Sequence, residues 1–205
     1  MMAGASTTIR AVLLSAIIVV PAVAGLPPAA AGETLDVAGT GAARTDANAE
    51  ERLRLLGELK AAKDEPTGRA VEKALWQFWI GLTDDTTQML LTDAMEARRS
   101  HDWDRALTLL HDVVDRAPHY AEGWNQRAFI WFLKEEYDKS LQDLDRTLEL
   151  EPKHFGALAG KFHVLFRQGR AGLAYAALRE AVAIHPWLRE RGMLPPGERE
   201  DGVDL

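Results

Sequence analysis

Three evenly spaced prolines constrain the fold of this chain more than any other feature of its sequence. Pro118, Pro152 and Pro186 stand 34 residues apart. When each proline is placed at position 32 of a repeating unit, position 24 is leucine and position 28 is valine or leucine in every unit. Apolar residues at such intervals share one face of a helix, and a proline ends the helix before it. The pattern predicts three helical units, which cover residues 87–120, 121–154 and 155–188.

Each unit reads as a hairpin of two helices. Small residues near positions 8 and 20, such as Ala94 and Ala106 in the first unit and Ala128 and Ser140 in the second, allow two helix backbones to approach closely. A single hairpin cannot bury its apolar face alone, so neighbouring hairpins stack. The sequence therefore predicts an all-α fold built by stacking.

The repeat resembles the tetratricopeptide repeat (TPR), which has the same period. The middle unit fits the family pattern through Trp124, Ala128, Trp131, Tyr137, Ser140, Leu144 and Pro152. The resemblance implies an all-α, right-handed α-solenoid of three TPR hairpins over residues 87–188, preceded by an N-terminal capping pair of helices. It also implies a protein-binding scaffold without catalysis and without a cofactor, but it names no partner.

Two units depart from the family pattern. In the first unit, Leu90 and Ala97 stand where the family has bulky aromatic residues. In the third unit, Phe162 occupies position 8, where a small residue is usual, and Ala171 replaces the aromatic residue of position 17. Because an overlarge core residue strains a close contact, we expect the third hairpin to open or shift locally.

Composition excludes several classes of function. The 205 residues carry a formal net charge of −7 and contain no cysteine. Binding to nucleic-acid phosphates relies on clustered Lys and Arg, so the negative charge disfavours it. The missing cysteines exclude thiol catalysis, disulfides and thiolate metal sites.

Residues 1–31 read as a signal peptide. Arg10 is the only charged residue among the first 32, and the apolar run 11–20 that follows it is too short to span a bilayer as a helix. Two sites with small residues follow, at 22–24 and 29–31, and they suit cleavage after Ala24 or after Ala31. The expected location is the periplasm or the outside of the cell; the alternative is an uncleaved membrane anchor.

The segments that flank the repeats differ in composition. Residues 32–49 are rich in Ala, Gly, Thr and Asp and predict a flexible leader. Helical patterning over 50–86 predicts two capping helices, with Pro66 in the first turn of the second and with Trp76 and Trp79 covering the open side of the first repeat. Asp84 or Asp85 is the expected N-cap of the next helix.

Residues 189–205 allow only a short turn followed by an acidic tail. The last repeat is therefore expected to show an apolar edge, only partly covered by Trp187 and Leu188. Exposed apolar patches often mark association, which makes a homodimer through this edge one hypothesis.

The resemblance also implies a concave groove, lined by positions 2, 5, 9 and 12 of each unit. At these positions Gln88 and Gly156 stand beside ten predicted partner-binding residues: Leu91, Met95, Arg98, Glu122, Asn125, Phe129, Phe132, Ala159, His163 and Phe166. The mixture of rings and few charges suits an extended peptide or a partner helix. The alternative interpretation is that some of these rings belong to the repeat core.

Two other modes of action fit the sequence less well. The TPR clamp for C-terminal carboxylates requires Lys, Asn and Arg at positions that here hold Leu91, Met95, Gln126, Gly156 and Gly160. The clamp pattern is therefore missing, and a C-terminal carboxylate ligand is not expected.

The alternative function is a metal-binding protein or an enzyme that uses His163 with acids of adjacent helices. The six histidines form no helical ligand pair with a catalytic acid between them, so no metal site is predicted.

Overall fold

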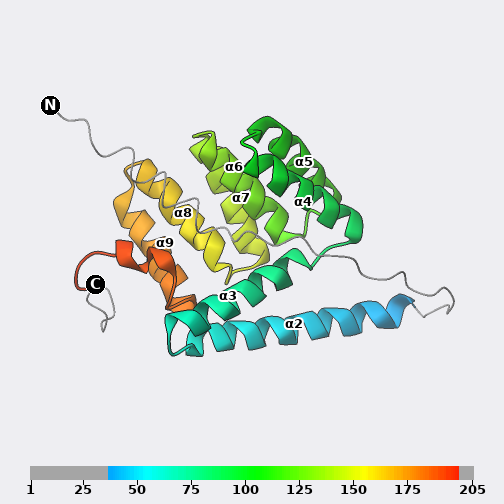
Figure 1. The fold of residues 1–205 in the computed structure, drawn as a ribbon, viewed down its shortest axis with the longest axis horizontal. Helices are drawn as coiled ribbons and strands as arrows, with labels where there is room; N and C mark the ends of the chain where they lie inside the picture. Colours follow the sequence, from blue (N-terminus) through cyan, green and yellow to red (C-terminus); the bar gives the residue numbers. More distant parts are fainter. Residues whose placement is uncertain (1–36, 199–205) are drawn as a thin grey trace. The chain divides into compact units, whose positions relative to one another are not determined.

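The repeats fold into helical hairpins in the predicted order. A computed structural model describes residues 37–198, with side chains from residue 46, and the predicted signal peptide lies outside these residues. The chain divides into two compact units, 1–51 and 52–205, and the contacts described below lie within the second. In chain order the helices are α2 (Val37–Ala61), α3 (Glu65–Ile80), α4 (Asp85–Arg99), α5 (Trp103–Arg116), α6 (Ala121–Leu133), α7 (Tyr137–Leu150), α8 (Phe155–Arg167), α9 (Ala171–Ile184) and the 3₁₀ turn η1 (Arg189–Met193) (Figure 1).

The three predicted hairpins are α4–α5, α6–α7 and α8–α9, and each stacks on the next through α5 with α6 and α7 with α8. The all-α helical solenoid is thereby confirmed. Position 24 forms the centre of each hairpin, because Leu110, Leu144 and Leu178 are all buried. Asp84 is the N-cap of α4 and accepts hydrogen bonds from the backbone N–H groups of Thr86 and Thr87, both at 3.1 Å.

The third hairpin is not opened by its large residue, contrary to the expectation from sequence. Phe162 is fully buried, with its ring centroid 6.0 Å from that of Tyr175 on α9. The facing helix supplies the room, since Ala174, Ala177 and Ala181 lie on its buried face beside Leu178. A large residue on one helix is thus matched by small residues on the other, which keeps the packed volume constant.

The segment predicted as a flexible leader is partly helical. Helix α2 begins at Val37 instead of near Glu50. Its apolar residues Leu55, Leu56 and Leu59 are buried and anchor the C-terminal part of the helix. Extending an existing helix costs little once a turn has formed, and the alanines of 37–49 favour it.

Helix α3 packs on the core of the first repeat through Ile80, but its two tryptophans do not cover that repeat as expected. Trp76 and Trp79 pack instead on His154 and Phe155, where the second unit meets the third. The Trp79 ring stacks on His154 with centroids 4.1 Å apart, and both indole N–H groups are buried without a hydrogen-bond partner. Ring packing therefore supplies this contact. Sequence register could not reveal it, because it joins segments far apart in the chain.

Helix α3 runs past the loops that follow all three prolines, in the order opposite to the repeats. Near its C-terminus, the Ile80 carbonyl accepts a hydrogen bond from the Tyr120 hydroxyl at 3.0 Å. At its middle, Trp76 lies against Gly156, where an added Cβ would stand 2.6 Å from Cη2 of the indole. Near its N-terminus, a Cβ on Gly68 would stand 2.8 Å from Cδ1 of Trp187. On each side of the interface between α3 and the repeats, a glycine thus leaves room for a tryptophan of the other side.

The segment after Pro186 covers more of the last repeat than its length suggested. Trp187 donates from Nε1 to the carbonyl of Ala62 at 2.9 Å. Leu188 and Leu194 are buried on either side of η1, which packs on α9. The turn η1 and Leu194 therefore add to the partial cover that was expected from Trp187 and Leu188 at the edge of the last repeat. The homodimer proposed through that edge remains an untested hypothesis.

We predict that Gly156→Ala destabilises the protein by about 1–3 kcal/mol, because its methyl group would overlap the Trp76 ring. The matched control is Gly172→Ala in α9, where an added Cβ meets open space. That change should stabilise by about 0.4–1 kcal/mol, because it restricts the unfolded chain. Thermal unfolding measures both. If both variants melt above the parent, Trp76 does not pack on Gly156.

Candidate binding face and its polar hub

The structure divides the ten predicted partner-binding residues into two groups. Five have buried side chains and are closed to a partner in this structure: Leu91, Glu122, Asn125, Ala159 and His163. Leu91 belongs to the core of the first hairpin. The other five are partly or fully exposed and are called the open face below: Met95, Arg98, Phe129, Phe132 and Phe166.

The closed part of the predicted groove is covered by the chain itself. Helix α3 lies over the start of α8, where Trp76 contacts Gly156 at position 2. The turn η1 brings Glu190 to His163 at position 9, with 3.6 Å between Nε2 and Oε1. The open face is what remains, toward the C-terminal ends of α4, α6 and α8. Helices α6 and α8 are neighbours on this face, where the ring centroids of Phe132 and His163 lie 6.5 Å apart.

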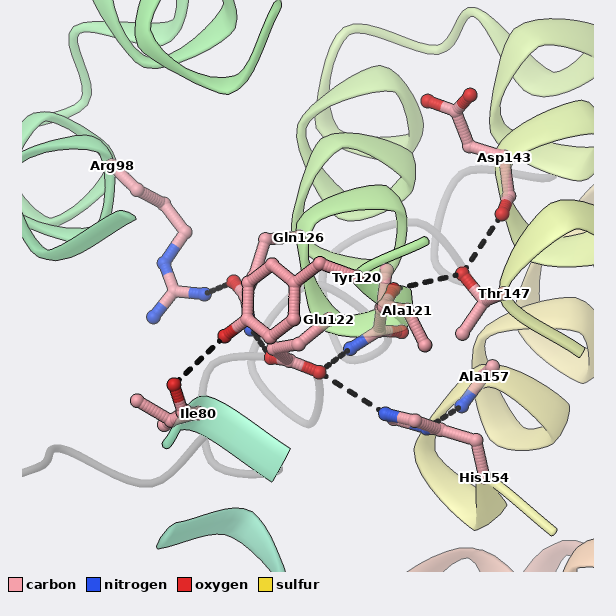
Figure 2. A network of polar contacts seen from close by, with 11 residues as sticks. Ile80, Arg98, Tyr120, Ala121, Glu122, Gln126, Asp143, Thr147, His154 and Ala157 are labelled. Carbon is pink, nitrogen blue, oxygen red and sulfur yellow. Dashed lines mark hydrogen bonds and ion pairs between the residues drawn. The ribbon is translucent and has the colours of Figure 1, made fainter. Parts of the chain in front are cut away.

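A buried carboxylate organises the polar side chains beneath this face (Figure 2). Glu122, on the first turn of α6, is 1% exposed. It accepts hydrogen bonds from Asn125 Nδ2 at 3.0 Å, from Gln126 Nε2, and from His154 Nε2 at 3.1 Å. Together with Arg98, these residues are called the polar hub below. A buried carboxylate is costly unless its oxygens are paired, and the three donors provide that pairing.

His154 links the hub to the backbone of α8. It is the N-cap of this helix, and its Nδ1 accepts a hydrogen bond from the Ala157 N–H at 3.1 Å. A ring nitrogen that accepts carries no proton. The Nε2 nitrogen therefore bears the hydrogen and donates it to Glu122. The same ring stacks on Trp79, so it couples the hub to α3 as well.

Arg98 connects the hub to the open face. Its Nη1 donates to Gln126 Oε1 at 2.8 Å, and its guanidinium lies 5.3 Å from the centroid of the Phe129 ring. Burial lowers the pKa of Arg98 to about 10, although the negative charge of Glu122 opposes this shift. The guanidinium remains charged at neutral pH and is held in place by an amide and a ring.

Tyr120 closes the hub on the side of α3. Burial, with a smaller contribution from the nearby Glu122 carboxylate, raises the pKa of its hydroxyl well above the ordinary value. The hydroxyl therefore keeps its proton and donates it to the Ile80 carbonyl. This hydrogen bond fixes the end of α3 against the loop that follows Pro118.

His163, the residue of the alternative metal or catalytic function, is buried beside Glu190 of η1. Burial raises the pKa of Glu190, but the adjacent His163 ring, a backbone hydrogen bond and the charge of Arg189 together outweigh burial and hold this pKa below its ordinary value. The stability that the lowered pKa of Glu190 contributes is present above the ordinary pKa of a glutamate and is lost as the pH falls through the lowered value. Among the residues that the structure describes, no group of three or more His, Asp or Glu side chains could hold a metal ion.

Gln126, His154 and Tyr120 are structural members of the site that sequence reasoning missed. Two local signals could have found part of it. Gln126 follows Glu122 by four residues, a spacing that brings side chains together on a helix. His154 immediately precedes α8, which is the N-cap position. The contact of Tyr120 with Ile80 has no local signal, because it joins residues 40 positions apart.

Comparison with known proteins agrees with the repeat pattern. No protein-family model matches the chain. A TPR repeat-containing protein of Rhizobium etli is 30% identical over 138 residues, which are 67% of this chain and 68% of that protein. This chain belongs to the tetratricopeptide repeat family. The TPR interpretation of its three units is thereby confirmed.

Solved TPR structures share the fold. The TPR domain of Arabidopsis OM64 superimposes with a TM-score of 0.50 at 16% identity, covering 50% of this chain and 85% of that domain. The type III secretion translocator chaperone SycD of Yersinia enterocolitica, also at a TM-score of 0.50, is 13% identical and covers 55% of this chain and 86% of its own. At such identities the likeness concerns the TPR fold alone.

We predict that Glu122→Leu destabilises this TPR protein by about 3 kcal/mol or more, because it leaves the donors of the hub buried and unpaired. Glu122→Gln keeps the size of the side chain and should cost less. The control is Glu96→Gln, which removes an exposed pair with Arg99 and should change stability by less than about 0.5 kcal/mol. Urea unfolding measures all three. Equal effects of Glu122→Leu and Glu96→Gln would contradict the role of the hub.

Proposed function

We propose that this TPR protein is an exported scaffold that binds a protein partner through its open face. The observation that carries the proposal is the set of rings that stay uncovered, while other predicted groove residues are buried in the hairpin core or covered by α3 and η1. Phe166 is 37% exposed, and Phe129 and Phe132 are partly exposed. Aromatic side chains in such positions supply most of the contact energy in protein interfaces.

The arrangement of these rings favours an extended segment of the partner. Phe129 and Phe132 stand on α6, and Phe166 stands on α8, so one segment can contact successive hairpins in turn. Met95 on α4 continues the row with a flexible apolar side chain. An extended peptide offers alternate side chains to such a row. The proposal includes no catalytic step.

Export is the second part of the proposal, and it rests on the sequence of residues 1–31. Their single charge, short apolar run and two small-residue sites are typical of a cleaved signal. Within the described residues, no helix has both the length and the apolar character needed to cross a membrane. The scaffold would then act in the periplasm or outside the cell.

We predict that Phe166→Ala weakens capture of the partner from a cell-envelope extract by about tenfold or more, as expected for an interface hot spot. Leu173→Ala is the matched control, because Leu173 is 53% exposed but lies on α9, outside the open face. Quantitative mass spectrometry of the captured proteins compares the variants. A partner lost equally with both changes, or with neither, would show that the open face is not the binding surface.

We predict that the mature protein begins at Gly25 or Gly32, after the two small-residue sites. Expression of the full chain in a bacterial host, followed by fractionation and intact-mass measurement, decides between them. An intact Met1 in the membrane fraction would favour the uncleaved anchor. An intact Met1 in the cytoplasmic fraction would contradict export.

A further inference from the structure

Arg98 and Arg127 have the same kind of aromatic contact but different polar partners. The Arg127 guanidinium lies 4.8 Å from the centroid of the Trp124 ring and makes a two-point ion pair with Asp143, at 2.7 and 2.8 Å. Arg98 lies over Phe129 in a similar way. Within residues 46–198, however, no carboxylate lies within ion-pair distance of Arg98, and its one hydrogen-bond partner is the neutral amide of Gln126.

Arg98 has side-chain N–H donors that no carboxylate of residues 46–198 engages. A guanidinium offers five N–H donors in a planar fork that matches a carboxylate. One of these donors is engaged by Gln126, and the ring of Phe129 covers one face. Arg98 is only partly buried and belongs to the open face, so the remaining donors can meet a group supplied from outside.

The hub keeps the guanidinium oriented. Gln126 donates to Glu122 through Nε2 and accepts from Arg98 through Oε1, which fixes the direction of its amide. Glu122 is in turn held by Asn125 and His154. A cation that is already oriented loses little further freedom when a carboxylate binds to it. The nearby Glu122 supports Arg98 through the amide but does not contact it.

We propose that Arg98 is the anion-binding residue of the open face, and that the partner presents an extended acidic segment with a carboxylate on Arg98 and apolar side chains on Phe132 and Phe166. This inference rests on the proposed function and adds the chemistry of the partner. Charge complementarity selects the acidic residue, because the partner's carboxylate would take the role that Asp143 has for Arg127. The rings select its apolar neighbours.

The test uses the full chain and two series of fluorescein-labelled peptides. In the first series Asp or Glu alternates with Leu and Phe; in the second, Asn or Gln replaces each acidic residue. Fluorescence anisotropy gives the dissociation constants. The acidic series should bind at least about tenfold more tightly, the size expected for a charge-assisted hydrogen bond. This comparison requires no variant, so it does not depend on the stability of a substituted protein.

Variants then locate the effect. Arg98→Gln should abolish the preference for acidic peptides, while Arg98→Lys, which keeps the charge but loses the fork, should retain part of it. Arg105→Gln is the control, because Arg105 is exposed on α5, outside the open face. Thermal unfolding verifies that each variant is folded.

Several results would overturn the proposal. Equal binding of both series that falls with Phe132→Ala would keep the open face as a binding surface but remove the role of Arg98. An acidic preference that survives Arg98→Gln, or the absence of binding by either series, would also overturn it. If sedimentation shows a dimer that Arg98→Gln dissociates, the occupant is a second copy of this chain. The capture experiment with Phe166→Ala tests the proposed function independently of these results.

Discussion

The close contact between α3 and the repeat array is the constraint on which the rest of this structure depends. Helix α3 has to pass the loops after all three prolines, and it does so where Gly156 admits Trp76 and where Gly68 admits Trp187. From Gly68 to Ile80 the helix rises about 18 Å, which is close to two spacings of packed helices at about 8–10 Å each. One straight helix can therefore contact three successive loops. This contact closes the start of α8 on the inner face, and with η1 it limits which residues are left for a partner.

The polar hub explains how a buried charge coexists with an apolar interface. Glu122 would be costly to bury alone, but it accepts hydrogen bonds from three side chains that come from α6 and from the N-cap of α8. Its influence extends through Gln126 to Arg98, at the edge of the open face. The same network contacts α3 through His154, which stacks on Trp79. The polar hub thus both supports the open face and contacts α3.

Most of the fold could be predicted from the sequence, because the repeat is local. The period of the prolines and the leucines at position 24 located three hairpins, and Asp84 and Pro66 marked helix starts that the structure confirms. The candidate site was only half predictable. Position in the repeat identified the inner face, but the contact of Trp76 with Gly156 and that of Glu190 with His163 come from segments outside the three repeats. Trp76 is apolar wherever it packs, so neither composition nor register could show that it lies against the third unit instead of the first.

The hydrogen bond from Trp187 to Ala62 joins residues 125 positions apart, and this has a consequence for how the protein forms. In an ordinary repeat array each unit contacts only its neighbours, and folding can begin anywhere and spread. Here the contacts of α3 include Trp187, which stands at the end of the last repeat. Loop closure over such a distance is slow compared with the formation of local hairpins. During synthesis, the hairpins can therefore form first, and the contacts of Ala62 and Gly68 with Trp187 can form only after Trp187 has been added.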